Sequence, residues 1–92
     1  MPKYSIIFTP NFKRDYKLIQ KRGYKIELLQ EVITTLANGE PLPEKNRDHA
    51  LTGNYKGFRE CHIQPDWLLI YQLEDEELLL FLTRTGTHSD LF

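Results

Sequence analysis

The sequence is poor in cysteine and in long hydrophobic runs, and each shortage excludes a class of protein. Its 92 residues include a single cysteine, Cys61, so an internal disulfide and a four-cysteine zinc module are excluded. Apolar runs such as Leu78–Leu82 are far shorter than the roughly 20 residues that a membrane helix needs, and the N-terminus lacks the basic and then apolar segments of a signal peptide. We therefore expect a cytoplasmic protein that does not enter the membrane.

The chain also has little net charge, and this argues against a uniformly basic nucleic-acid binder. The balance is −1, from 12 Lys and Arg against 13 Asp and Glu. The charge is unevenly spread, because residues 1–47 carry nine basic and five acidic side chains whereas residues 48–92 carry three and eight. One face of the molecule can therefore be basic. With 40% hydrophobic residues, we expect one core and a single domain spanning residues 1–92.

Hydrophobic periodicity predicts an α+β fold with the element order βααβββ. Strands are indicated by alternation with period two, and helices by apolar residues three and four positions apart. The expected elements are strands at about 3–9, 56–64, 67–73 and 78–83, and helices at about 10–22 and 26–37. We expect an antiparallel sheet with the two N-terminal helices packed on one of its faces.

Three histidines, His49, His62 and His88, fall in three different segments of the sequence. If the loop that carries His49 lies beside the strand at 56–64, and the C-terminal tail folds back over the same face, the histidines meet the carboxylates of Glu60 and Asp66. Histidine can both accept and donate a proton near neutral pH, and a carboxylate fixes its tautomer. Such a set is suited to metal-independent transfer at phosphate, in which a base removes the proton of an RNA 2′-hydroxyl and an acid protonates the leaving oxygen.

Other interpretations of these residues remain open at this point. Each histidine also fits an ordinary surface or core position, and a zinc site that combines histidines with Cys61 or Asp66 is conceivable. However, the sequence contains no H-x-x-x-H or C-x-x-C pair. Alternation along the strand also directs Cys61 away from Glu60 and His62, so we expect no bound metal and no other cofactor.

Three longer strings give the sequence a family resemblance. They are RDHALTG at 47–53, KGFRECHIQPDW at 56–67 and RTGTHSDLF at 84–92. Together they closely resemble the YafQ branch of the RelE/ParE toxin superfamily, and the similarity extends over the whole chain. The resemblance implies a RelE-like fold and the toxin of a type II toxin–antitoxin system.

The activity implied by this resemblance is that of an mRNA endonuclease that enters the ribosomal A site, where it also meets 16S rRNA. The implied partner is a DinJ/RelB-like antitoxin, and operator DNA is reached only through that antitoxin. Carried over by position, the implied cleavage residues are His49, His62, Asp66 and His88. Glu60 stands where the branch carries aspartate, and Phe92 matches a terminal aromatic residue implicated in activity.

Basic side chains supply further candidates for RNA binding. Lys13, Lys17 and Lys21 form one stripe along the first expected helix, a pattern that is also typical of a solvated helix face. Arg59 and Arg84 are candidate cations for the phosphate, although regular alternation places Arg59 on the strand face opposite the histidine.

An alternative function comes from a different class of protein. A ParE-like member of the fold can act without nuclease activity, by poisoning a partner such as gyrase or as a co-repressor working through its antitoxin. The histidines discriminate between the two hypotheses, because a toxin that only binds a partner needs no acid–base cluster.

Overall fold

The computed structural model describes residues 2–92 and has the expected α+β architecture. Its helices and strands are β1 (Ser5–Phe8), α1 (Pro10–Lys21), α2 (Ile26–Ala37), β2 (His49–Ala50), β3 (Arg59–Gln64), β4 (Trp67–Glu74), β5 (Leu79–Gly86) and α3 (His88–Leu91). Short 3₁₀ turns occupy Glu44–Asn46 and Gly53–Tyr55. No helix within residues 2–92 combines the length and apolar character needed to span a membrane.

The strands form one five-stranded sheet in the order β1-β5-β4-β3-β2. The expectation of a wholly antiparallel sheet holds for β2 to β5 and is wrong for β1, which pairs with β5 in parallel from Ser5 opposite Leu79 to Phe8 opposite Leu82. The reason is topological. β1 and β5 are joined through most of the chain rather than by a hairpin, so no short turn dictates antiparallel pairing.

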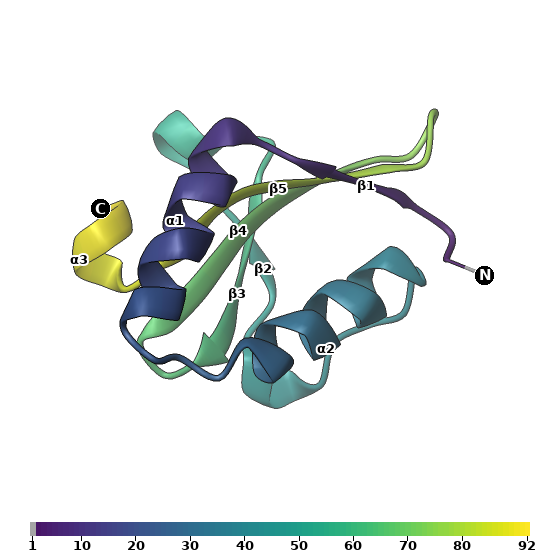
Figure 1. Ribbon diagram of the computed structural model, residues 1–92. Helices are drawn as coiled ribbons and strands as arrows, with labels where there is room; N and C mark the ends of the chain where they lie inside the picture. Colours follow the sequence, from purple (N-terminus) through teal and green to yellow (C-terminus); the bar gives the residue numbers. More distant parts are fainter. Residues whose placement is uncertain (1) are drawn as a thin grey trace.

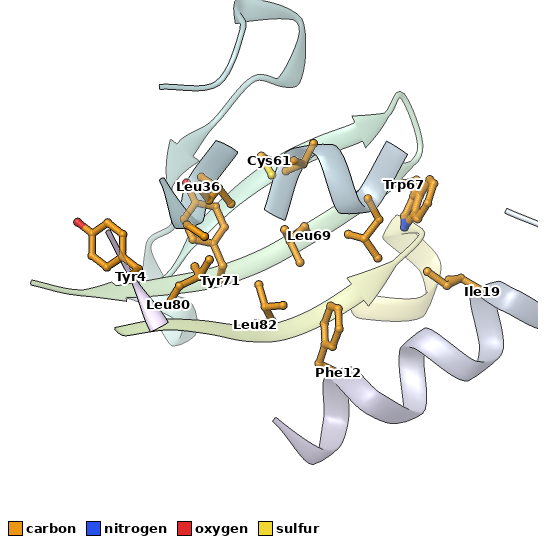
Figure 2. Packing of buried hydrophobic residues seen from close by; sticks show 13 residues of the cluster. Tyr4, Phe12, Ile19, Leu36, Cys61, Trp67, Leu69, Tyr71, Leu80 and Leu82 are labelled. Carbon is orange, nitrogen blue, oxygen red and sulfur yellow. The ribbon is translucent and has the colours of Figure 1, made fainter. Parts of the chain in front are cut away.

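Both N-terminal helices lie on one face of the sheet, as expected. α1 packs against β5 and α2 against β3 (Figure 1). Between them and the sheet lies the larger core, whose side chains come from both helices and from alternate positions of the strands. The buried residues labelled in Figure 2 are Tyr4, Phe12, Ile19, Leu36, Cys61, Trp67, Leu69, Tyr71, Leu80 and Leu82.

The residues at the start of α1 define where the helix begins and also connect it to the sheet. Thr9 is the N-cap, and its hydroxyl accepts a hydrogen bond from the Phe12 backbone N–H at 3.2 Å, while Pro10 occupies the first turn, where no backbone N–H is needed. The same hydroxyl donates to the Leu82 carbonyl at 2.9 Å. The cap therefore also ties the helix to β5.

The opposite face of the sheet carries a smaller cluster built around Leu68 and Ile70 of β4. It is covered by Leu91 of α3 and by partly buried residues of the segment 51–58. Neither β2 nor α3 is among the elements expected from periodicity, because both are too short to show one. α3 lies over the face that holds the histidines, and β2 pairs with β3 at the edge of the sheet.

Candidate functional site

His49 is placed by β2, the two-residue strand that pairs with β3. His49 lies directly opposite Glu60 in that pairing. The His49 Nδ1 lies 2.7 Å from the Arg47 carbonyl oxygen. Because a carbonyl can only accept, Nδ1 carries the proton, and the other ring nitrogen is left free to exchange one. This nitrogen, Nε2, is 3.6 Å from the Glu60 carboxylate.

Glu60 and His62 occupy alternate positions of β3 and therefore share the face that His49 joins. The Glu60 side chain is 8% exposed, and its Oε1 atom lies 3.6 Å from His49 Nε2 and 3.8 Å from His62 Nε2. A nearly buried carboxylate between two imidazoles stabilises either ring in its cationic form. The cross-strand register and the alternation of β3 thus unite three of the candidate residues.

His88 and Asp66 complete the cluster from the other end of the sheet. Asp66 lies in the turn between β3 and β4, and its Oδ1 atom accepts hydrogen bonds from the His88 Nδ1 at 2.7 Å and from the His88 backbone N–H at 3.2 Å. These two bonds lower the pKa of Asp66 below its usual value, so the carboxylate stays charged. The His88 and His62 rings meet edge-to-face with centroids 5.9 Å apart, which joins both halves of the site.

The helix α3 positions His88, and a capping box stabilises the N-terminal end of this helix. Thr87 Oγ1 accepts from the Asp90 backbone N–H at 3.2 Å, and Asp90 Oδ2 accepts from the Thr87 backbone N–H at 2.9 Å. Arg22, at the end of α1, donates to both Asp90 carboxylate oxygens at 2.6 and 3.0 Å. Gly86 allows this approach, since a Cβ there would lie 2.9 Å from Asp90 Oδ2.

Asp48 anchors the segment that carries His49 to the other side of the sheet. Its carboxylate accepts hydrogen bonds from the Tyr71 hydroxyl and from Arg59 Nε, the latter at 3.3 Å. Burial is the main cause that raises the pKa of Tyr71, and the hydrogen bond to Asp48 raises it further. The Tyr71 hydroxyl therefore remains a donor. Arg59 consequently lies on the helix-bearing face, as strand alternation predicts, and the structure does not bring it to the histidine cluster.

Arg84 and Phe92 are two other candidates for RNA binding, and the structure ties the Arg84 guanidinium to α1. Arg84 stands opposite Ile70 in the β4–β5 pairing, and Asp15 of α1 accepts two hydrogen bonds from its guanidinium at 2.6 and 3.1 Å. Phe92 is 62% exposed and packs edge-on against Tyr55, with ring centroids 5.5 Å apart. Tyr55, partly buried in the cluster around Leu68 and Ile70, was not among the sequence candidates. The aromatic rings of Tyr55 and Phe92 suit stacking with RNA bases.

The lysine stripe is on α1, away from the histidines. Lys13 and Lys17 line a groove of about 770 Å³ between α1 and α2, whose apolar lining includes Tyr16 and Ile33. Lys21 is exposed further along the helix. The stripe and the histidine cluster are therefore two separate surfaces.

Comparison with known proteins tests the family resemblance of the sequence motifs. A family model described as the YafQ bacterial toxin of a type II toxin–antitoxin system matches residues 4–92. The mRNA interferase toxin YafQ of Escherichia coli (strain K12) is 43% identical over 93 residues, covering 100% of this chain and 99% of that relative.

The chain belongs to the YafQ toxin family. This confirms the resemblance of its sequence motifs to that family. The E. coli DinJ–YafQ toxin–antitoxin complex contains a chain that superimposes on this YafQ family member with a TM-score of 0.89, at 43% identity and with 98% of each chain covered. A metal-bound toxin from Helicobacter pylori superimposes with a TM-score of 0.91, at 45% identity, covering 97% of this chain and 99% of that one.

The metal in the H. pylori relative raises the question of whether the residues of this YafQ family member fit one. Within residues 2–92, no group of three or more His, Cys, Asp or Glu side chains is arranged to hold a metal ion. Cys61, a ligand candidate in the zinc interpretation, is fully buried in the core on the opposite face. Cys61 therefore cannot join the histidines around a metal ion.

Sequence reasoning missed the residues that hold this YafQ family site in position. The Thr87-x-x-Asp90 spacing is a capping-box pattern, and it could have indicated α3. No local signal joins Asp90 to Arg22 or Asp48 to Tyr71, because each pair is assembled by tertiary packing.

Proposed function

We propose that this protein is an endoribonuclease that cleaves mRNA by attack of a 2′-hydroxyl on the adjacent phosphate, with no metal ion in the reaction. Support comes from the family, from the E. coli relative named an mRNA interferase, and from the histidine cluster. The observation that carries the proposal is the orientation of two accessible imidazoles. The His49 side chain is 50% exposed and that of His88 is 54% exposed, and each has its Nδ1 engaged by a hydrogen-bond acceptor.

The proposed reaction uses one exposed histidine as base and the other as acid. The base takes the proton of the 2′-hydroxyl through its free Nε2, and the 2′-oxygen forms a bond to phosphorus. The bond from phosphorus to the 5′-oxygen breaks, and the acid delivers its Nε2 proton to that oxygen. The products are a 2′,3′-cyclic phosphate and a 5′-hydroxyl. His62, whose side chain is 17% exposed, lies between the two and is placed to stabilise the crowded phosphate.

Each carboxylate supports one charged intermediate of this scheme. Asp66 orients His88 through a hydrogen bond and stabilises its cation. Glu60 stabilises positive charge on His49 and His62 from 3.6 and 3.8 Å. A ParE-like toxin that only binds a partner needs none of these oriented contacts. The acid–base geometry therefore favours the nuclease over that alternative.

The same proposal covers targeting and inhibition. We place the substrate in the ribosomal A site in the cytoplasm, with Lys13, Lys17 and Lys21 meeting phosphates of 16S rRNA. A DinJ/RelB-like antitoxin occupies the groove between α1 and α2, where an apolar lining and the Lys13 and Lys17 ammonium groups suit an acidic amphipathic segment. Operator DNA is contacted through the antitoxin alone.

The proton-transfer roles can be tested with a substrate that does not need an acid. Replacing the bridging 5′-oxygen at the cleavage site by sulfur supplies a good leaving group, so loss of the general acid no longer slows cleavage. With ordinary message in programmed ribosomes, His49→Ala and His88→Ala should each cleave about 10² to 10⁴ times more slowly than wild type. With the sulfur-bridged message, one of the two variants should recover and the other should not.

The wild-type protein provides a control for the type of reaction and for its independence of metal ions. Wild-type cleavage should leave cyclic phosphate ends and persist when transition metals are chelated at constant Mg²⁺. Recovery of neither variant on the sulfur substrate, or loss of wild-type cleavage with the chelator, would contradict the proposed acid–base mechanism.

A further inference from the structure

A second groove, separate from the one between the helices, opens directly beside His62. It has a volume of about 620 Å³, within the range of roughly 300–1,000 Å³ that is typical of ligand sites. Its apolar surface comes from Leu28, Ile63 and Pro65, and its polar surface from Lys45, Asn46, Arg47, His62 and Gln64. An apolar floor with a cationic rim matches the two parts of a nucleotide, its base and ribose on one hand and its phosphate on the other.

The cationic rim is held firmly against the catalytic strand by the residue at its centre. Asn46 is 5% exposed, and its side-chain amide donates to the His62 backbone carbonyl at 2.7 Å. The residues on either side, Lys45 and Arg47, are exposed and take part in none of the ion pairs formed within residues 2–92. Both charges are therefore available to a ligand, and the backbone that carries them is fixed beside His62 through Asn46.

Arg47 also links this groove to the proton-transfer machinery. Its backbone is left-handed, with φ 46° and ψ 46°, a conformation that costs a residue with a side chain about 1–2 kcal/mol. In this conformation its carbonyl receives the His49 Nδ1–H at 2.7 Å. Strain of this kind persists where the surroundings impose it, and it concentrates at functional sites.

We propose that this groove is the binding subsite for the RNA strand on one side of the scissile phosphate, with Lys45 and Arg47 contacting two backbone phosphates. The inference rests on the proposed nuclease function and extends it, because it assigns the path by which the strand leaves the histidine cluster. Phosphate contacts of this type position a strand without reading its sequence. The subsite therefore sets affinity and alignment, while codon preference is determined elsewhere.

The test compares two double variants that change the charge equally. Lys45→Gln/Arg47→Gln removes the rim, and the control Lys3→Gln/Arg14→Gln removes one lysine and one arginine that lie outside the groove. The probe is a single-stranded RNA with a 2′-O-methyl group at the cleavage position, which cannot react, and its affinity is measured over a range of salt concentrations. Each phosphate contact on a single strand contributes about 0.7 to the slope of log affinity against log salt.

The groove variant should lower that slope by about 1.4 relative to the control, and Lys45→Arg/Arg47→Lys should restore it. RNAs lengthened stepwise on one side of the cleavage position should gain affinity with wild type and not with the groove variant, whereas lengthening on the other side should affect both proteins alike. On cleavable message the groove variant should show a higher KM than the control variant.

An unchanged salt slope in the groove variant, or equal losses in the two double variants, would overturn the subsite. Failure of the nuclease proposal is a different result, in which wild type leaves cleavable message intact. The binding comparison with unreactive RNA distinguishes the two, because it does not depend on cleavage.

Discussion

Glu60 offers the sharpest test of how the site works, because its carboxylate faces two histidines from a nearly buried position. Replacing Glu60 with Gln keeps the size of the side chain and removes its charge. If His49 is the base of the proposed mechanism, a proton arrives during the transition state on its Nε2, which lies 3.6 Å from the carboxylate. The substitution therefore removes an interaction that is strongest in the transition state, so it should lower kcat rather than raise KM.

The magnitude follows from the geometry. Two opposite unit charges about 4 Å apart attract by about 4 kcal/mol at an effective dielectric constant near 20. Because half of the His49 side chain is exposed, solvent screening reduces this to about 2 kcal/mol. Since each 1.36 kcal/mol is about a tenfold change in rate, Glu60→Gln should lower kcat about 30-fold.

The assay is single-turnover cleavage of message at saturating protein, together with urea unfolding of each variant. Glu60→Asp is the matched control, since it retains the charge at a somewhat greater distance and should keep kcat within about fivefold of wild type. Removing a nearly buried carboxylate should change the free energy of unfolding by no more than about 1 kcal/mol. Cleavage by Glu60→Gln within threefold of the wild-type rate would refute the electrostatic role, and a large loss of stability would show a structural role instead.

Two further predictions concern the anchoring of α3 and the lysine stripe. Hydrogen bonds from Arg22 and from the Thr87 backbone lower the pKa of Asp90, so its contribution to stability is complete above the ordinary carboxyl pKa of about 3.9 and is lost as pH falls from there toward the lowered value. Asp90→Asn should therefore be about 1 kcal/mol less stable than wild type at pH 7 and should approach wild type in acid. A difference in the free energy of urea unfolding that does not change with pH would contradict this. A triple Lys→Gln variant at Lys13, Lys17 and Lys21 should lose ribosome affinity at moderate salt, as measured by sedimentation, and should bind the antitoxin more slowly, as measured by stopped-flow mixing. If association does not change across a salt titration, the stripe is an ordinary solvated surface.

The sequence by itself determined the kinds of elements and the face on which most site residues lie. Alternation along β3 placed Glu60 and His62 on one side and Cys61 and Arg59 on the other, and the structure agrees. This succeeds because the period of a strand is a local property of the backbone. The limits of α1 were equally readable, since capping and helix breaking act within a few residues.

Only the tertiary structure decided how the site is assembled. His49 meets Glu60 through the register of β2 on β3, and His88 is held over Asp66 by a helix that Arg22 anchors across 68 positions of sequence. The parallel pairing of β1 with β5 and the groove beside His62 arise in the same way. These contacts depend on hydrogen bonds and packing between distant segments, and periodicity within any one segment carries no information about which distant partner it will meet.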